Sequence, residues 1–586
     1  MSMVTYTSYY HQVPSPQNQA KKNSNKIPRD VVGSGIGVSG TSSEWDLLPP
    51  VSEVIESVDS FSRHYFQLSF ISKNRFIFRL REDHRSVSPF LLLSILSISA
   101  RLTPSLVRRF GSGPKASEAF IEHATQLSAR KVYERPSLEA CQAFYLLGIA
   151  QQRSGWKELS SMNMAISIRL AVLMELHRES AYAISNPSRE QIVVAESARR
   201  TLWMLYDQDS LHSGPTSPAS LVSDNIDTLL PCSEGDFDSG REPSHRAALE
   251  DLPQACGELK LTFDSGQSLF ASLIQIRHIW GIIAKSAMNF ERSLYPWDSQ
   301  SEFSKRAAKL KWWEDGLPGE HLWNPSLLKG YGGVGQDTEA YLEVTMTTKL
   351  CNIVLRRSYL HDILFLDTGD KSRQNYFSDM SYQLFSHVQS LFEQGDARFT
   401  ASGAEGDTGA QLGLFCMYVC GLFSAYLARY PDICPDAGLS RRGYGMLQRA
   451  ISILAEGQET WPLATRWRIA LEKLSTANGM PSPTLPPLTL PEAPQRLFLP
   501  GPPMAAPLLL PPQSQSQTAG LPRICVPPCP IPAPHMSPPS AECFGMSGQG
   551  RGEAGAGAAL GPGNDGFEAE LRFHLYGEES RPRVFG

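Results

Sequence analysis

The sequence predicts an all-α protein, and three observations support this class. Apolar residues recur at three- and four-residue steps between Pro and Gly breaks, which is the spacing of one face of a helix. No stretch shows the alternation of apolar and polar residues that is typical of a half-buried strand. Hydrophobic residues make up 41% of the 586 residues and charged residues 19%, which is enough apolar material for a large core.

The expected helices lie between Pro and Gly breaks in the middle of the chain. Helices are expected to begin at Ser88-Pro89, with a stop at Pro104, and at Pro136-Ser137, because proline is favoured in the first turn of a helix. The others are expected at 162–176, 190–209, 268–292, 303–314, 340–364, 375–393, 410–429 and 441–455.

Composition divides the chain into three parts. Residues 1–49 are rich in Ser, Asn, Gln and Gly without helical periodicity, and we expect them to be disordered. Residues 50–475 carry the helical patterns. Residues 476–586 are expected to be a disordered Pro/Gly-rich tail, because 20 prolines at 481–540 prevent a continuous helix or a central strand. Removing this tail should therefore leave the helical region folded.

The segment 408–428 allows two interpretations. Its 21 residues carry no charge, which is about the length that spans a bilayer. A helix that is apolar all round can equally be the core helix of a globular protein. Gln411 and Ser424 within the segment, and the lack of a flanking basic cluster, favour the core helix over a membrane span.

The sequence contains only weak matches to motifs that are typical of enzymes or of metal sites. Gly35, Gly37 and Gly40 fit G-x-G-x-x-G, but neither a strand nor a helix pattern surrounds them, so we interpret them as a Gly/Ser segment. Ten cysteines are too few for a disulfide scaffold and indicate reduced, mostly buried thiols. Cys416 and Cys420 share a helix face without a nearby His, which favours core packing. An irregular set with intervening prolines is interpreted as an accidental cluster rather than a zinc site: Cys525, Cys529, His535 and Cys543. We therefore expect no enzyme, no metal and no cofactor.

Two stretches are the most informative, NMAISIRLAVLMELHRE at 163–179 and ESARRTLWMLYDQDSLHSGPTSPASLVSDNIDTLLP at 196–231. In the second, an Arg pair precedes a Trp, and an apolar face follows at helical spacing. From the residues alone this is a helix hairpin with a salt-bridged seam. We expect Trp203 to be buried, and Arg199 or Arg200 to pair with an internal acid such as Glu196.

These stretches resemble the fungal-specific transcription factor domain, the helical regulatory region of fungal zinc-cluster transcription factors. Its helix A-I-R-M-A-x-x-L-G-L-H-R precedes R-R-T-F-W-x-x-x-x-x-D-R and a closing D-I-D-x-x-L-P. A late Trp461-Pro462 with Arg466-Trp467 resembles the helix that closes the domain, so the resemblance covers about 50–475. The structural motif residues that match are Arg169, His177, Arg199, Arg200, Trp203, Asp209, Asp227 and Pro231, with Ala171, Leu176, Arg178, Thr201, Ile226 and Leu230 beside them.

The chain also departs from the family pattern. Asp207 replaces an apolar residue, and Ser210 and Ser217 replace arginines. Residues 1–140 contain no cysteine, so the six-cysteine zinc cluster cannot form there. The net charge of −5 gives no general basic field for nucleic acid. A thin basic patch can be a solvated linker or a nuclear-import or phosphate contact: Lys21, Lys22, Lys26 and Arg29.

The resemblance implies a nuclear transcription regulator that controls a pathway-specific gene set, such as a secondary-metabolite cluster. It implies contact with DNA indirectly, through a partner or a zinc cluster missing from this sequence. The implied partners are the transcription machinery, another transcription factor or a second copy of the chain, without a membrane. The alternative is a helical scaffold or membrane-associated protein anchored through residues 408–428.

Overall fold

The computed structural model describes residues 43–65, 68–212, 219–250, 252, 262, 267–289, 291–330, 336–365, 370–401, 411–458, 461, 463–477 and 567–576. In these ranges the regular secondary structure is entirely helical, which confirms the predicted all-α class. The Gly35 motif, the basic patch at 21–29, Ser217, and the cluster of Cys525, Cys529, His535 and Cys543 lie outside the described residues.

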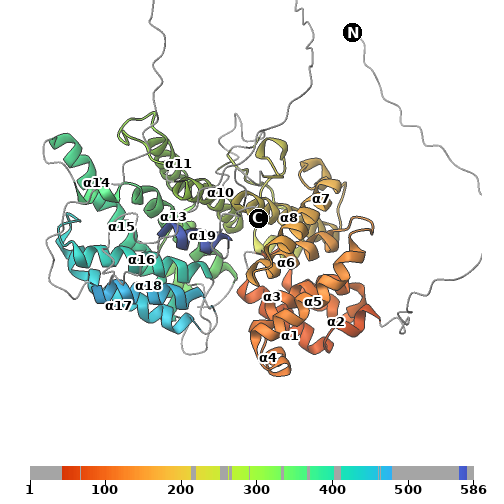
Figure 1. Ribbon diagram of the computed structural model, residues 1–586. Helices are drawn as coiled ribbons and strands as arrows, with labels where there is room; N and C mark the ends of the chain where they lie inside the picture. The colour runs from red at the N-terminus through yellow and green to blue at the C-terminus, as the bar shows by residue number, and fades with distance from the viewer. Residues whose placement is uncertain are drawn as a thin grey trace, which may run out of the picture.

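The first lobe is drawn in red to yellow in Figure 1. Its helices α3, α5 and α6 pack on one another, and α3 also packs on α1. The Ser137 hydroxyl accepts the Ala140 N–H at 3.2 Å and caps α6, at the predicted Pro136-Ser137 start. The helices are α1 (Val51–His64), α2 (Lys73–Asp83), α3 (Pro89–Ser99), α4 (Pro104–Phe110), α5 (Gly113–Lys131), α6 (Leu138–Arg153), α7 (Lys157–Leu173), α8 (Arg189–His212) and α9 (Glu234–Ser239).

The second lobe, in green to blue, surrounds α16 (Figure 1). Helix α10 joins the lobes, because it packs on α8 of the first and on α13 of the second. The helices are α10 (Leu269–Met288), α11 (Glu302–Gly316), α12 (Pro325–Gly330), α13 (Gln336–Arg357), α14 (Leu360–Leu364), α15 (Lys371–Ala401), α16 (Gln411–Arg429), α17 (Ala437–Gly457), α18 (Leu463–Ala477) and α19 (Phe567–Tyr576).

Helix α16 is the uncharged segment for which the sequence allowed two interpretations. It is long and apolar enough to cross a membrane over Leu412–Arg429, and 83% of that stretch is buried inside the protein. The bent pair Pro89–Leu102 and Pro104–Phe110 is also apolar enough, with an angle of 88° between its parts. Helices α13, α15, α17 and α18 pack on α16, and a Cβ atom at Gly421 would overlap Leu471 of α18. The helix thus occupies the core position that the sequence favours, and Cys416 and Cys420 are buried free thiols within it.

The two ends of the described chain differ from the expectation of disorder. Within residues 1–49, Glu44–Leu47 form a short 3-10 helix that is capped by Ser43. Within residues 476–586, α19 is a helix whose Phe567 and Leu571 are fully buried. The expectation was wrong for these segments. It relied on average composition, which does not register a ten-residue amphipathic helix that packs on a distant part of the chain.

Candidate functional site

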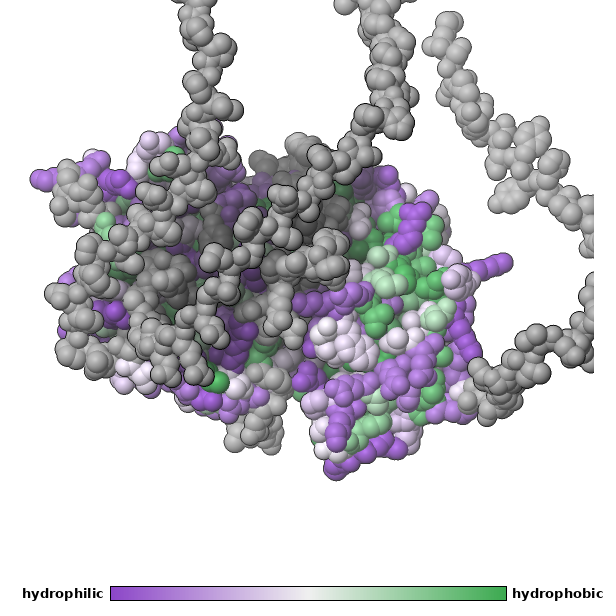
Figure 2. Space-filling view, in the orientation of Figure 1, coloured by the Kyte–Doolittle hydropathy of each residue, from purple (hydrophilic) through white to green (hydrophobic). Residues whose placement is uncertain are grey.

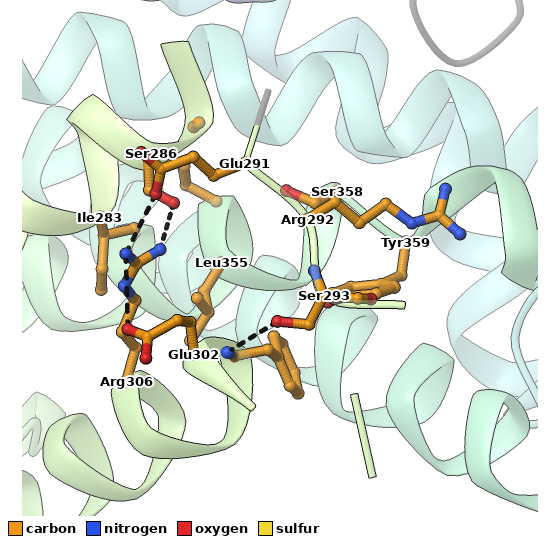
Figure 3. Close-up of a pocket in the computed structure, with 13 residues that line it drawn as sticks. Ile283, Ser286, Glu291, Arg292, Ser293, Glu302, Arg306, Leu355, Ser358 and Tyr359 are labelled. Carbon is orange, nitrogen blue, oxygen red and sulfur yellow. Dashed lines mark hydrogen bonds and ion pairs between the residues drawn. The ribbon is translucent and has the colours of Figure 1, made fainter. Parts of the chain in front are cut away.

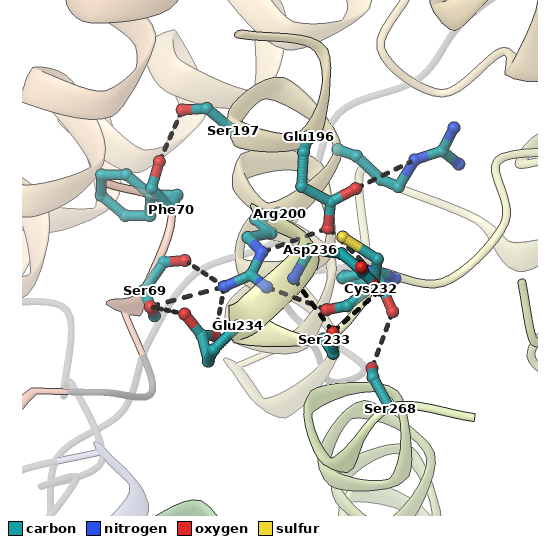
Figure 4. A network of polar contacts seen from close by, with 12 residues as sticks. Ser69, Phe70, Glu196, Ser197, Arg200, Cys232, Ser233, Glu234, Asp236 and Ser268 are labelled. Carbon is teal, nitrogen blue, oxygen red and sulfur yellow. Dashed lines mark hydrogen bonds and ion pairs between the residues drawn. The ribbon is translucent and has the colours of Figure 1, made fainter. Parts of the chain in front are cut away.

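Two of the predicted motif residues, Arg199 and Arg200, belong to a buried network of charges in the middle of α8, and Figure 4 draws the part of it around Arg200. We call this set the α8 network. It ties α8 to the loop before α2, to the chain that follows α7, and to the segment 226–234 that leads into α9. Its charged members are Glu179, Glu196, Arg199, Arg200, Glu234 and Arg246.

Arg200 is the central cation of the α8 network and is fully buried. Its Nη1 donates to the carbonyl oxygen of Ser69 and its Nη2 to that of Cys232, both at 2.9 Å. Its Nε donates to Glu196 at 3.2 Å, and its Nη1 also pairs with Glu234. A buried charge is stable only when it is paired and hydrogen bonded, so these contacts fix three chain segments around one guanidinium. Two rings cover its faces, those of Phe237 and Phe270.

Arg199 binds the chain on the other side of α8. Its Nη1 and Nη2 donate to the two carboxylate oxygens of Glu179, at 2.6 and 2.7 Å, in a bidentate pair. Nη1 also donates to the carbonyl oxygen of Leu229 at 2.9 Å. The guanidinium lies 4.1 Å from the centre of the Tyr182 ring. Arg199 therefore holds both the 179–182 turn and the closing segment against α8.

Glu196 is the anion shared by the arginines. It accepts hydrogen bonds from Arg246 Nη1 at 2.7 Å and from the Cys232 N–H at 2.9 Å, in addition to Arg200. Burial alone would raise the pKa of Glu196, but Arg246, Arg200 and Arg199 lower it to about 2. Glu196 is therefore ionised at neutral pH, as the predicted seam requires.

Trp203 is fully buried one turn further along α8, as predicted. Its Nε1 donates to the same Leu229 carbonyl oxygen at 3.0 Å. Its ring packs edge-on against Tyr206, with 5.5 Å between centroids. Leu229 thus receives hydrogen bonds from both Arg199 and Trp203, which anchors the closing segment.

The other motif residues arrange the backbone around the network. Asp227 accepts the Glu179 N–H at 2.7 Å and donates its own N–H to the His177 carbonyl oxygen at 3.1 Å. Pro231 accepts the hydroxyl of Ser268, the residue that caps α10, at 2.7 Å. Burial and the nearby Arg178 lower the pKa of His177.

Two predicted residues lie away from this centre. Asp209 accepts the N–H groups of Ser220 and Leu221, at 2.6 and 2.7 Å, and so closes the turn after α8. Arg169 is exposed on the outer side of α7. Arg169 is therefore not a member of the α8 network, although it belongs to the same sequence motif.

A second buried cluster explains the departure at Asp207. This carboxylate accepts Arg277 Nη1 at 3.0 Å, and Glu343 accepts Arg277 Nε at 2.8 Å. Burial raises the pKa of Asp207 and of Glu343, and the Arg277 guanidinium opposes that rise. The cluster joins α8, α10 and α13, and so connects the two lobes. Arg277 and Glu343 lie outside the sequence motifs, at distances along the chain that helical spacing cannot relate, so sequence patterns do not identify them.

The contacts of the α8 network attach neighbouring chain segments to α8. Its ionised groups engage opposite charges, and burial raises the pKa of the Cys232 thiol, which keeps the thiol protonated. Within the residues described, no group of three or more His, Cys, Asp or Glu side chains is placed to hold a metal ion. The network holds chain segments in place and presents no activated nucleophile.

Comparison with known proteins points to the part of the chain that contains the α8 network. The family model of the fungal specific transcription factor domain matches residues 59–315, which contain the whole α8 network. Two uncharacterized transcriptional regulatory proteins of Schizosaccharomyces pombe are similar to this chain. One is 24% identical over 334 residues, with 52% of this chain and 45% of the relative covered. The other is 24% identical over 287 residues, with 46% and 29% covered. The match thus spans less than half the length of each relative. Residues 59–315 of this chain are thus similar to the fungal specific transcription factor domain.

Proposed function

We propose that the protein is a transcription regulator of the nucleus that acts through its helical domain without catalysis. The observation that carries this proposal is the coincidence of the family match with the α8 network. The two relatives named as transcriptional regulatory proteins support it. A network that fixes loops around a buried guanidinium suits a rigid docking module.

DNA contact is proposed to be indirect, through a partner that reads the sequence. Specific readout needs side chains that a rigid element presents to base edges. In this family the zinc cluster supplies that element, and residues 1–140 contain no cysteine. The target genes are proposed to form a pathway-specific set, such as a secondary-metabolite cluster, as the resemblance implies.

A second copy of the chain is the partner best supported by the surface of α7. Three large apolar side chains are exposed on it: Leu159 at 40%, Met162 at 61% and Leu173 at 55%. Leu159, Ile166 and Leu173 are seven residues apart, which is about two turns, so they share one face with Met162 beside it. Figure 2 shows a hydrophobic area over the part of the molecule where α7 lies in Figure 1.

The spacing on α7 suits antiparallel pairing with itself. A two-fold axis at Ile166 would place Leu159 of one copy opposite Leu173 of the other, because each lies seven residues from the axis. The exposed Arg169 lies close to this face. Light scattering on the purified chain tests the dimer. Leu173→Asp should give monomers, whereas Phe78→Asp, at a 66% exposed position on α2, should leave the dimer intact. A wild-type monomer at micromolar concentration would contradict the proposal.

The nuclear role is tested in cells. Imaging of the tagged protein should place it in the nucleus, and chromatin immunoprecipitation should recover a limited gene set that depends on a DNA-binding partner. The alternative is a scaffold anchored in a membrane through 408–428. Burial of α16 among four helices counts against that alternative. Recovery in the membrane fraction after a high-salt wash would favour it.

A further inference from the structure

A cavity of about 630 Å³ lies between α11, α13 and α15, outside the α8 network. This volume is within the range of pockets for small molecules. Helix α11 covers one side with Phe303, Ala307 and Ala308, while α15 contributes Met380 to the apolar lining. The polar groups that line it come from all three helices: Ser304, Lys311, Glu314, Asp315, Asn352, Arg356, Tyr376, Asp379, Gln383 and His387.

Arg356 is the unusual member of this lining, because it is a buried cation without a carboxylate partner. Its exposed fraction is 9%. Its Nε and Nη2 donate to Gln383 Oε1 at 3.2 and 2.9 Å, and its Nη1 donates to the Asn352 carbonyl and side-chain oxygens at 3.1 and 2.8 Å. These acceptors are all neutral. Burial accordingly lowers the pKa of the Arg356 guanidinium.

The other buried arginines of the described ranges provide a comparison for Arg356. Over the described ranges, five arginines are buried, and the remaining four each pair with a carboxylate: Arg199 with Glu179, Arg200 with Glu234, Arg357 with Glu568, and Arg398 with Glu339. An unpaired buried charge is costly, so a carboxylate is the group that the Arg356 site lacks.

A neighbouring cavity provides an internal comparison (Figure 3). It has a volume of about 360 Å³ and shares Phe303 with the first. There the protein supplies the anions itself, since Arg306 binds Glu291 at 3.1 Å and Arg292 binds Asp362 at 2.5 Å. The arginines of the smaller cavity are thus paired with carboxylates, whereas Arg356 in the larger cavity donates only to uncharged amide groups.

Two further polar groups line the larger cavity as neutral species. Burial raises the pKa of Tyr376 to about 12, so its hydroxyl can donate a hydrogen bond at neutral pH. Burial, with Arg356 and Lys349, lowers the pKa of His387 to about 3, so its imidazole is uncharged. The acids around the cavity already have partners: Glu314 binds Lys349 at 2.5 Å, Asp315 binds Lys311 at 2.9 Å, and Asp379 accepts Gln383 at 2.6 Å.

We infer that the cavity between α11, α13 and α15 binds a small organic monocarboxylate. The carboxylate pairs with Arg356, which offers the charge-assisted hydrogen bonds that such groups prefer. The apolar part of the molecule packs against Phe303, Ala307 and Met380. Asp379, whose hydrogen-bond donor Gln383 is uncharged, adds negative charge at the cavity and disfavours a dianion. This inference is independent of the role in transcription.

Benzoate is a suitable probe, and benzamide is its uncharged control. Saturation-transfer NMR and calorimetry on the full chain should detect benzoate binding at millimolar concentration and much weaker binding of benzamide. Arg356→Gln should weaken benzoate binding at least ~10-fold, the effect of losing a charged hydrogen-bonding partner. Arg306→Gln, which alters the already neutralised arginine of the neighbouring cavity, should change it less than ~2-fold.

The stability of the same proteins provides a second measurement. Benzoate should raise the melting temperature of the wild type and of Arg306→Gln, but not that of Arg356→Gln. If Arg356→Gln does not fold, Tyr376→Phe replaces it, with an expected loss of ~5-fold in benzoate affinity. Equal binding of benzoate and benzamide, no detectable benzoate binding, or unchanged binding by the substituted protein would each overturn the inference.

Discussion

Trp467 and Glu570 are hydrogen bonded, Nε1 to Oε2 at 3.0 Å, although 103 positions separate them in the chain. Arg466 Nε donates to the other carboxylate oxygen at 2.7 Å, so Glu570 of α19 accepts hydrogen bonds from both Arg466 and Trp467 of α18. Arg357 of α13 pairs with Glu568, and the His574 ring stacks on Phe415 of α16 at 4.1 Å. The C-terminal helix is therefore part of the core of the second lobe.

This docking predicts the effect of truncation. A chain that ends at Gly566 loses α19 and with it the fully buried Phe567 and Leu571. Since each such side chain contributes about 1.5–3 kcal/mol, we expect the lobe to remain folded but to lose about 3–6 kcal/mol. Urea denaturation measures the loss. A chain that ends at Tyr576 retains α19 and is the control, with no change expected. Equal stability of the two truncated chains would show that α19 does not pack in solution.

The docking of α19 should also depend on pH. Burial lowers the pKa of His574 to about 3, against an ordinary value of 6.5. Protons therefore bind the undocked helix more tightly. Docking is at full strength above pH 6.5 and weakens as pH falls toward 3, by about 2 kcal/mol at pH 5. The protection of the α19 amides against hydrogen exchange, relative to their intrinsic exchange rates, should therefore fall over this range. His574→Gln removes the titrating group, so its exchange should lack this component, and an identical pH profile would contradict the role of His574.

Trp203→Ala should destabilise the domain strongly. The side chain is fully buried and donates to the Leu229 carbonyl oxygen, so its loss leaves a cavity and removes one of the two hydrogen bonds to that oxygen. We expect a cost of about 3–5 kcal/mol, the usual range for a buried large aromatic residue. Trp156→Ala, at a position with 39% exposure, is the matched control and should cost much less. An unchanged thermal midpoint for Trp203→Ala would disprove its structural role.

Glu196→Gln tests the charge balance of the α8 network. It leaves Arg200 and Arg246 with one anion fewer in a buried site, at an expected cost of about 3–5 kcal/mol. The pKa of Glu196 is lowered from 4.5 to about 2, so its contribution is complete above pH 4.5 and is lost as pH falls toward 2. Acid unfolding of Glu196→Gln should therefore be less steep than that of the wild type. The exposed Glu118→Gln should match the wild type at every pH.

The α8 network shows what the sequence is able to predict. Helical spacing places Trp203 on the buried face, and a charged pair beside it needs an acid within reach, which Glu196 provides one turn away. The acids that complete the pairs, Glu179 and Glu234, come from loops. Their positions depend on how the chain returns to α8, which local periodicity does not specify.

The contacts between distant segments were not predictable by the same reasoning. Asp207, which departs from the family pattern, pairs with Arg277 of α10, and Arg277 also pairs with Glu343 of α13. In α19, Phe567, Glu570, Leu571 and His574 lie at positions i, i+3, i+4 and i+7, a recognisable helix face. The signal covers only ten residues and follows a long Pro-rich stretch, so the average composition concealed it.

The polypeptide of residues 1–586 should bind DNA weakly and without sequence preference when no partner is present. Specific readout needs a rigid element in a groove, and a zinc cluster folds only around its thiolates, none of which occurs in residues 1–140. The basic residues near the N-terminus are Lys21, Lys22, Lys26 and Arg29. Four phosphate contacts give a slope of about −3.6 in a plot of log K against log salt, and this is the behaviour of non-specific binding. Fluorescence anisotropy with random duplexes at several salt concentrations measures the slope. Substitution of the four residues by Gln should abolish the salt dependence, whereas preference for one site by ~10³-fold at physiological salt would show that this polypeptide reads DNA directly.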